Sequence, residues 1–315
     1  MKRSSADKKE SIKMDKKRTV LQFVTFLFLI SAVSVFVCPE AKAETLTINT
    51  RAGDIFELRF RKLQPGEPLF FLWNHKVSDY VNIFFMENIY QLKNEPDKKQ
   101  FLLLGFDLMA KPGVKSLDLE LWSDGRQIEK VSFPLEVLAR DFPKLKLKVD
   151  QKYVTPPKLV QERIRRESEL LAHIYSIVTP DWLAEGHFIL PCEGKLYPNF
   201  GQQRIYNNVP RSVHSGIDIA VPRGEKIKAT NSGLVVLASD LYFSGKTIII
   251  DHGLGLFSSY SHLSRLLVRR GEKVRQGQVI GLAGSTGLST GPHLHWAVKI
   301  REVRVDPLAI LELEF

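Results

Sequence analysis

Residues 293–300 read His-Leu-His-Trp-Ala-Val-Lys-Ile, an apolar run that opens with two histidines two positions apart. The aromatic and β-branched content of this run predicts a strand. Side chains two positions apart on a strand project from the same face. We therefore expect His293 and His295 to enter one groove while Leu294 packs behind them. The preceding residues 281–292 are rich in Gly, Ser and Thr, which is typical of a loop at the rim of a cleft.

Two upstream segments carry further polar residues. In His214-Ser215-Gly216-Ile217-Asp218, three residues separate an imidazole from a carboxylate, and Gly216 permits a backbone bend that turns both side chains to one point. This pattern alone is a weak signal because it occurs by chance in many chains. In Ser259-Tyr260-Ser261-His262-Leu263, strand alternation places Tyr260 and His262 on a common face.

Histidines are concentrated in the last third of the chain. Five of the eight lie there: His214, His252, His262, His293 and His295. Catalytic zinc needs three ligands drawn from His, Asp or Glu, and an open position for water. Buried hydrogen-bonding histidines would explain one or two of these residues, but not five polar groups at the separations of His214, Asp218, His262, His293 and His295. For His252, in Asp251-His252-Gly253, we expect a turn at a strand end, with orientation of a ligand as the alternative.

The same region carries an ordered series of short motifs. They are Asn199-Phe-Gly201, His214-Ser-Gly-Ile-Asp218, Pro222-Arg-Gly224, Ala229-Thr-Asn-Ser-Gly233, Ile250-Asp-His-Gly253, Tyr260-Ser-His-Leu263, Gly277-Gln-Val-Ile-Gly281, Gly284-Ser-Thr-Gly287, Thr290-Gly-Pro-His-Leu-His295 and Val305-Asp-Pro307. Together they resemble the lysostaphin-like, LytM-type zinc endopeptidase family over residues 190–311.

The resemblance implies roles for five side chains. His214, Asp218 and His295 match the family's zinc ligands, with one Zn²⁺ per chain. His293 and His262 match its two unliganded histidines, which we assign as general base and oxyanion stabiliser respectively, although the sequence leaves an exchange of these roles open. No separate cofactor-binding residues are expected. Arg204 lies one residue beyond the family's usual Gly-x-Arg spacing, so no role is assigned to it.

Ahead of this region, residues 44–150 have the pattern of an immunoglobulin-like β-sandwich. Short apolar runs alternate with turn residues, and Leu117-Asp118-Leu119-Glu120-Leu121 sets three leucines on one face. The predicted strands are 46–50, 55–60, 69–73, 81–85, 101–104, 117–122, 131–137 and 145–149. Inhibition of the enzyme, its orientation, and docking on the wall or on a protein partner remain open as roles for this domain.

Residues 151–189 are expected to form an extended linker and one helix. Tyr153-Val154-Thr155-Pro156-Pro157 predicts the linker, and the apolar spacing over 159–178 predicts the helix, ended by Thr179-Pro180. The helix alternates arginines with glutamates, which favours a solvated surface over a nucleic-acid patch. The fold expected overall is mainly β, with a compact antiparallel metallopeptidase domain of the duplicated-hybrid-motif type at 190–315.

The N-terminal residues 1–43 predict an export signal or an uncleaved membrane anchor. Residues 1–18 hold eight Lys or Arg against three Asp or Glu, half of the chain's net charge of +10, and a long apolar run follows at 19–38. Ala41-Lys42-Ala43 has the form of a signal-peptidase site. An uncleaved segment would anchor the chain in the inner membrane. The remaining charge does not single out nucleic acid. Cys192 alone cannot form an intramolecular disulfide once Cys38 is removed.

These patterns predict a zinc metalloendopeptidase of the periplasm or cell envelope. The resemblance implies that its substrates are peptidoglycan cross-links. Because an exported enzyme without a disulfide is compatible with a periplasm, D-alanyl–diaminopimelate bonds are favoured over glycine bridges. The alternative is a non-catalytic wall-binding factor that activates another hydrolase, as relatives with broken metal sites do. The intact ligand set His214, Asp218 and His295 favours the enzyme.

Overall fold

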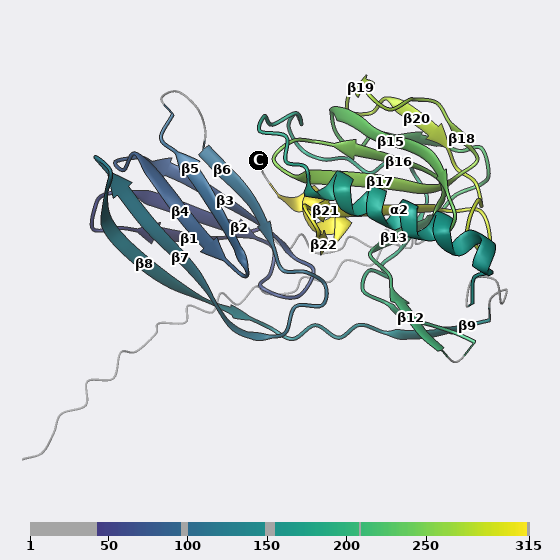
Figure 1. Cartoon of the computed structure of the whole chain (residues 1–315), viewed down its shortest axis with the longest axis horizontal. Coiled ribbons are helices and arrows are strands. Elements are labelled where there is room, and N and C mark those ends of the chain that lie inside the picture. Colours follow the sequence, from purple (N-terminus) through teal and green to yellow (C-terminus); the bar gives the residue numbers. More distant parts are fainter. Residues whose placement is uncertain (1–42, 96–99, 149–154, 208, 314–315) are drawn as a thin grey trace, which may run out of the picture. The chain divides into compact units, whose positions relative to one another are not determined.

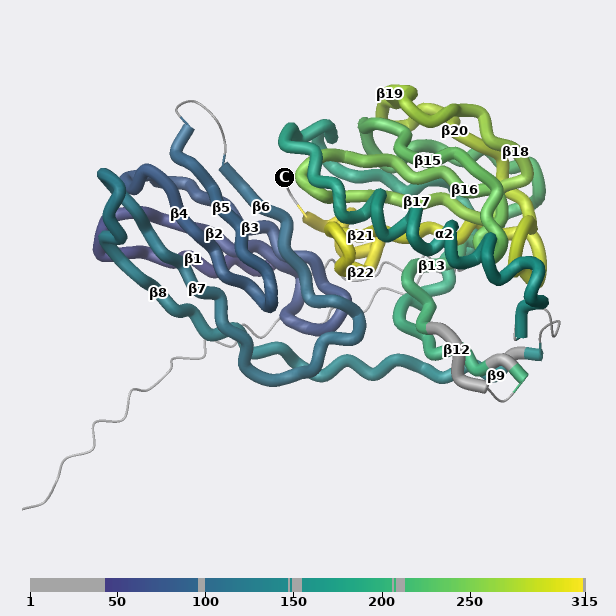
Figure 2. Tube along the Cα trace, viewed as in Figure 1, coloured from purple at the N-terminus to yellow at the C-terminus, as the bar shows by residue number. Residues whose placement is uncertain are grey.

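The structure is a computed structural model that describes residues 43–95, 100–148, 155–207 and 209–313 (Figure 1 and Figure 2). The predicted leader, apart from its last residue, and residues 151–154 of the predicted linker lie outside the described residues. Among the residues described, no helix is both long enough and apolar enough to cross a membrane.

Two four-stranded antiparallel sheets form the N-terminal sandwich (Figure 1). Their strand orders are β1-β2-β3-β6 and β5-β4-β7-β8. The bounds are β1 Glu44–Asn49, β2 Ile55–Phe60, β3 Pro68–His75, β4 Tyr80–Phe85, β5 Asn88–Lys93, β6 Gln100–Gly105, β7 Gly113–Ser123 and β8 Arg126–Val137. The predicted β-sandwich is thus present, with four strands in each sheet where immunoglobulin constant domains have four and three.

Alternating apolar residues fill the space between these sheets. Leu117, Leu119 and Leu121 are fully buried, as the alternation predicts. Trp73 is also buried, and its indole N–H donates a hydrogen bond of 2.9 Å to Asp54. Burial of a paired tryptophan stabilises the sandwich core. Trp73 is therefore a packing residue of the sandwich core.

Two strands differ from the prediction. The pattern does not predict β5, because the turn between β4 and β5 is Met86-Glu87, without Gly, Asn or Pro; Met86 adopts a φ of 53°. The strand expected at 145–149 exists as β9 (Lys144–Leu147), but it pairs in parallel with β11 and does not join the sandwich. An alternating pattern indicates which face of a strand is buried and leaves its partner strand unspecified.

The predicted helix is present as α2 (Lys158–Ser176). It buries Ile174 and Tyr175 against Leu237, Ile249 and Phe257 of the C-terminal sheet. Its exposed face carries ion pairs spaced three or four residues apart: Arg163–Glu167, Arg165–Glu162, Arg165–Glu169 and Arg166–Glu162. These pairs confirm the predicted solvated helix surface.

One large sheet organises the C-terminal part, in the order β10-β13-β21-β17-β16-β15-β19 with β22 paired to β21. Two three-stranded sheets, β12-β11-β9 and β14-β20-β18, accompany it. The bounds are β10 Lys195–Tyr197, β11 Gln203–Tyr206, β12 Val209–Val213, β13 Gly216–Ala220, β14 Lys226–Lys228, β15 Gly233–Leu241, β16 Gly245–Asp251, β17 Leu256–Leu263, β18 Arg265–Leu266, β19 Lys273–Val274, β20 Val279–Leu282, β21 Leu294–Ile300, β22 Val303–Val305 and α3 Pro307–Glu312. All pairings in the large sheet are antiparallel, as expected from the family resemblance.

The two faces of the large sheet differ in chemistry. Ile217 on β13 and Leu294 on β21 are fully buried in the main apolar core. Their neighbours Asp218 and His295 are only partly buried and project from the opposite face. The candidate site lies on this second face of the sheet.

Ion pairs join the sandwich to the C-terminal part. Arg304 donates from Nε and Nη2 to the two oxygens of Asp107, at 2.9 and 2.5 Å. Arg140 and Arg61 both reach Asp306 Oδ2, at 2.7 and 3.1 Å. The contact of Arg304 with Asp107 is two-pronged and therefore directional.

Candidate metal centre

Three donor side chains from separate segments meet on the polar face of the large sheet. Asp218 is aligned with His295 across β13 and β21, and His214 lies in the turn between β12 and β13. His214 Nε2 lies 3.0 Å from Asp218 Oδ1 and 2.9 Å from His295 Nδ1. His295 Nδ1 lies 3.0 Å from the same oxygen. The structure thus brings the three predicted metal ligands together.

The spacing of these three atoms fits a single zinc ion. Zinc ligands lie about 2.0–2.1 Å from the ion, which sets two ligands of a tetrahedral site about 3.3 Å apart. The observed separations of 2.9–3.0 Å are close to that value. Two imidazole nitrogens and one carboxylate oxygen are also the donor types that zinc prefers. The residues present therefore fit zinc.

Contacts outside this triangle orient the ligands. His214 Nδ1 lies 3.0 Å from the Asn199 carbonyl, so its N–H donates there and Nε2 carries the lone pair. The Asn199 side chain donates to Asp218 Oδ2 at 2.8 Å and accepts from the Asp218 main-chain N–H at 3.1 Å. Arg204 Nη2 donates to the same Oδ2 at 3.1 Å. Oδ2 is thus held by the protein, whereas Oδ1 faces the other two ligands.

The sequence assigns no role to Asn199 or Arg204. Asn199 belongs to the motif Asn199-Phe-Gly201, but this motif does not indicate that the Asn199 side chain contacts Asp218. Arg204 is brought to Asp218 by the pairing of β11 with β12, which contains a register shift between Arg204 and Ile205. The extra residue lies on β12, so the spacing along β11 is unchanged. The contact of Arg204 with Asp218 depends on strand pairing, which the spacing of residues along the chain does not reveal.

Burial and hydrogen bonding set the charges of the site. Burial lowers the pKa of His214 to about 4, so the ring is neutral at pH 7. Burial by itself acts to raise the pKa of Asp218, but the polar contacts of its carboxylate with the rings of His214 and His295 outweigh burial and hold that pKa well below its usual range. A neutral imidazole and an ionised carboxylate are the forms that bind a metal cation.

Two further imidazoles face this centre. His293 Nε2 lies 3.7 Å from Asp218 Oδ1, and the ring centroids of His293 and His262 are 4.8 Å apart. His293 Nδ1 lies 2.8 Å from the Gly291 carbonyl, and His262 Nδ1 lies 2.8 Å from the Thr286 carbonyl. Each Nδ1–H donates to its carbonyl, so each neutral ring keeps a bare Nε2 that can accept a proton.

The expected common face for Tyr260 and His262 is wrong. Tyr260 is fully buried in the core, and its hydroxyl accepts a hydrogen bond of 2.8 Å from Thr230 N–H. His262 has a φ of 63°, in the left-handed region, and the pairing of β17 with β16 shifts register nearby. The backbone therefore leaves regular strand geometry at His262, and its ring faces His293.

His252 is a structural residue. It is fully buried, with Nδ1 2.7 Å from the Ser232 carbonyl and Nε2 2.7 Å from Ser258 Oγ. Both ring nitrogens are therefore engaged away from the three ligands. Burial lowers the pKa of His252 to about 4, which keeps the ring neutral. This supports the turn interpretation over orientation of a ligand.

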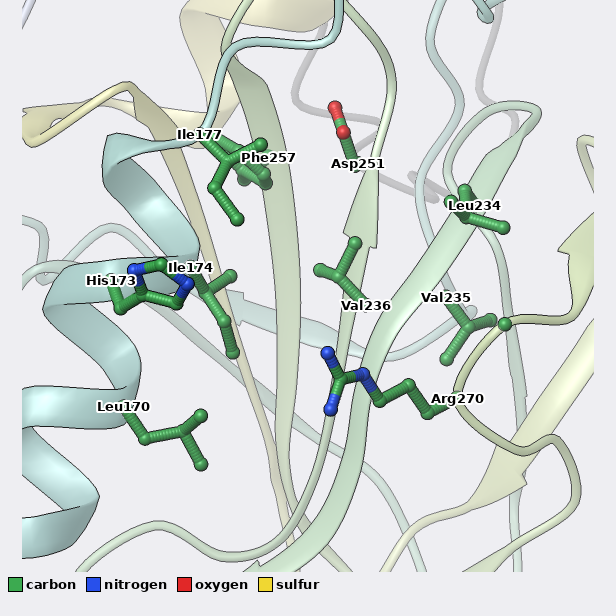
Figure 3. Close-up of a pocket in the computed structure, with 11 residues that line it drawn as sticks. Leu170, His173, Ile174, Ile177, Leu234, Val235, Val236, Asp251, Phe257 and Arg270 are labelled. Carbon is green, nitrogen blue, oxygen red and sulfur yellow. The ribbon is translucent and has the colours of Figure 1, made fainter.

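A separate apolar pocket lies between α2 and the sheet (Figure 3). Ile174, Ile177, Val236 and Phe257 contribute apolar side chains to it, and Arg270 extends beside it. None of the five predicted site residues lines this pocket. It therefore belongs to the packing of the helix on the sheet.

Comparison with known proteins agrees with this geometry. Residues 212–307 match the model of peptidase family M23, so this part of the chain is a peptidase family M23 domain. All five predicted site residues lie within it.

Curated relatives share this segment. The chain is 38% identical over 108 residues to the peptidoglycan DD-endopeptidase ShyA of Vibrio cholerae, which covers 34% of this chain and 25% of ShyA. It is 39% identical over 98 residues to the DD-carboxypeptidase/endopeptidase Mpg of Neisseria meningitidis, covering 31% of this chain and 23% of Mpg. The match thus spans about a quarter of each relative's length.

One solved structure resembles a larger part of the chain. A peptidase M23 crystal structure from Pseudomonas aeruginosa has a TM-score of 0.59 and 28% sequence identity, covering 80% of this chain and 96% of that chain. Because the M23 segment is much shorter than this, the structural similarity extends into the N-terminal sandwich.

Proposed function

We propose that this chain is a zinc-dependent endopeptidase that hydrolyses peptide cross-links of bacterial peptidoglycan, at D-alanyl–diaminopimelate bonds. The observation that supports this most directly is the convergence of His214, Asp218 and His295 within 3.0 Å, with His262 and His293 beside them. The names of the M23 relatives support the substrate class. The place of action is then the periplasm or cell envelope.

The metal would be held by His214 Nε2, Asp218 Oδ1 and His295 Nδ1. Zinc in such a donor set supplies Lewis-acid chemistry, because it polarises a carbonyl and lowers the pKa of water to about 7. Asn199 and Arg204 keep the Asp218 carboxylate in one orientation through Oδ2. This preserves the position of Oδ1 relative to the two imidazoles.

His293 is proposed to move the proton. Its Nδ1–H is tied to the Gly291 carbonyl, so its bare Nε2 accepts the proton of the attacking water and returns it to the leaving amine. His262 is proposed to stabilise the oxyanion. In the free chain, burial lowers the pKa of His262 to about 3, and its neutral ring has a bare Nε2. To stabilise the oxyanion, the ring has to take up a second proton on Nε2 as the negative charge develops. In the exchanged assignment, the bare Nε2 of His262 is the base and His293 stabilises the oxyanion.

Digestion of purified peptidoglycan by the full chain tests the proposal. We expect monomeric muropeptides with new D-alanyl carboxyl and diaminopimelate amino ends. A chelator should abolish their release and added zinc should restore it. His214→Ala should be inactive, whereas His75→Ala, at an exposed position of β3, should match wild type. Equal release by wild type and His214→Ala would contradict the proposal. Wall binding by the zinc-loaded wild type without cleavage would favour a non-catalytic factor.

A further inference from the structure

The exposed aromatic residue Tyr197 lies one strand beyond the aligned metal-ligand candidates Asp218 and His295. Tyr197 on β10 is aligned with Asp218 on β13, which is in turn aligned with His295 on β21. Aligned residues of antiparallel strands project from the same face, with Cβ atoms about 4.5–5.5 Å apart. β10 is the edge strand of this sheet, and Tyr197 is 43% exposed. Its ring therefore stands in solvent directly beside the proposed metal centre.

A lysine stands on the same face of this edge strand. Lys195 is two residues from Tyr197, which places it about 6.8 Å along the strand. Its Nζ lies 5.4 Å from the centre of the Tyr197 ring, within the range of a cation–π contact. Within the part of the chain that the structure describes, no carboxylate forms an ion pair with Lys195. The ammonium group is therefore available to a ligand.

The other nearby cation is already engaged. The Arg204 guanidinium is bonded to Asp218, and its side chain is 21% exposed. Asp218 is in turn surrounded by His214, His295, Asn199 and Arg204. Lys195 is the charged residue of β10 itself, and its positive charge lies next to the aligned residues Tyr197, Asp218 and His295.

From this geometry we propose that Lys195 and Tyr197 form a subsite for a carboxylate-bearing residue of the substrate, next to the scissile amide. The inference rests on the proposed function and names its substrate class more narrowly. The ammonium group pairs with the carboxylate, and the ring packs on the adjoining methylene groups. Peptides cross-linked through diaminopimelate carry both features. A bridge of glycines carries neither side-chain methylenes nor a side-chain carboxylate, so this subsite disfavours it.

A substrate pair that differs only in charge tests the subsite. One substrate is a cross-linked muropeptide dimer with free diaminopimelate carboxylates, and the other is the same dimer with those carboxylates amidated. The zinc-loaded full chain is compared with Lys195→Gln, with Lys195→Arg, and with Lys226→Gln as an exposed control on β14. The measurements are KM and kcat for each substrate. Calorimetric binding of the uncrosslinked peptide, free and amidated, gives a readout that does not depend on turnover.

We expect Lys195→Gln to raise KM for the free-carboxylate dimer about 3- to 10-fold, with kcat within about twofold and no change for the amidated dimer. Lys195→Arg should stay close to wild type, and Lys226→Gln should match it. Equal KM of wild type for both dimers, or an equal effect of Lys195→Gln on both, would overturn the subsite and leave the endopeptidase intact. Failure of the wild type to cleave either dimer would overturn the proposed function. Equal binding of free and amidated peptide would then overturn the subsite independently.

Discussion

Replacing Asn199 with alanine should weaken zinc binding without unfolding the chain. The substitution removes two side-chain hydrogen bonds to Asp218, of 2.8 Å to Oδ2 and 3.1 Å from its main-chain N–H. Loss of such outer contacts typically lowers metal affinity 10- to 100-fold. Arg204 still holds Oδ2, and the carbonyl that accepts from His214 belongs to the main chain and remains. We therefore expect the zinc dissociation constant to rise about 10- to 30-fold, which is equivalent to a loss of about 1.4–2 kcal/mol of binding free energy.

The assay is competition for zinc between the full chain and a chromogenic chelator at pH 7. Asn74→Ala, at an exposed position of β3, is the matched control and should bind zinc as wild type does. Urea unfolding of each metal-free variant shows whether the fold is retained. If Asn199→Ala keeps the fold and its zinc dissociation constant stays within twofold of wild type, the orientation of Asp218 does not depend on this side chain and the reasoning fails.

Three other predictions concern stability. Because His252 is buried with a pKa of about 4 against 6.5 when unfolded, its contribution to stability is complete above pH 6.5 and is lost as the pH falls toward 4. The free energy of unfolding of wild type relative to His252→Asn should fall by about 3 kcal/mol over that range in urea titrations; a constant difference would contradict this. Gly245→Ala should destabilise by about 1–3 kcal/mol more than Gly224→Ala, because both have positive φ but only the first collides with Thr286; equal urea midpoints would argue against the collision. Arg304→Lys should lower the free energy of unfolding by about 1 kcal/mol, since a lysine cannot form the two-pronged contact with Asp107; an unchanged midpoint would show that the fork adds nothing.

The sequence predicts the elements better than it predicts their partners. Leu117, Leu119 and Leu121 are buried as predicted, because the side-chain period of a strand is a local property. β9 illustrates the limit, since its partner β11 lies far along the chain and nothing local specifies it. The same limit hides Tyr197, whose place beside Asp218 depends on the register of β10 with β13.

The candidate site shows a similar division. The motifs supplied all five side chains that the structure brings together, because ligand identity is carried by residue type and order. The contacts of Asn199 and Arg204 with Asp218 depend on loop geometry and on strand pairing, which have no signal in the composition. The left-handed φ of His262 is also invisible in the sequence, because glycine is the usual mark of that conformation.

The segment that follows the sandwich pairs and packs with residues close in the chain to the candidate site. Its strand β9 pairs with β11, which carries Arg204, and β11 pairs with β12, which leads directly into His214. Phe142, just before β9, packs edge-to-face on Phe200 at 6.2 Å and covers Gly201, where an added Cβ would collide with its ring. These contacts lie next to Asn199. A catalytic domain delimited from its motifs alone starts at residue 190. It therefore omits β9 and Phe142, which support the segments that carry Arg204 and Asn199, the two residues that orient Asp218.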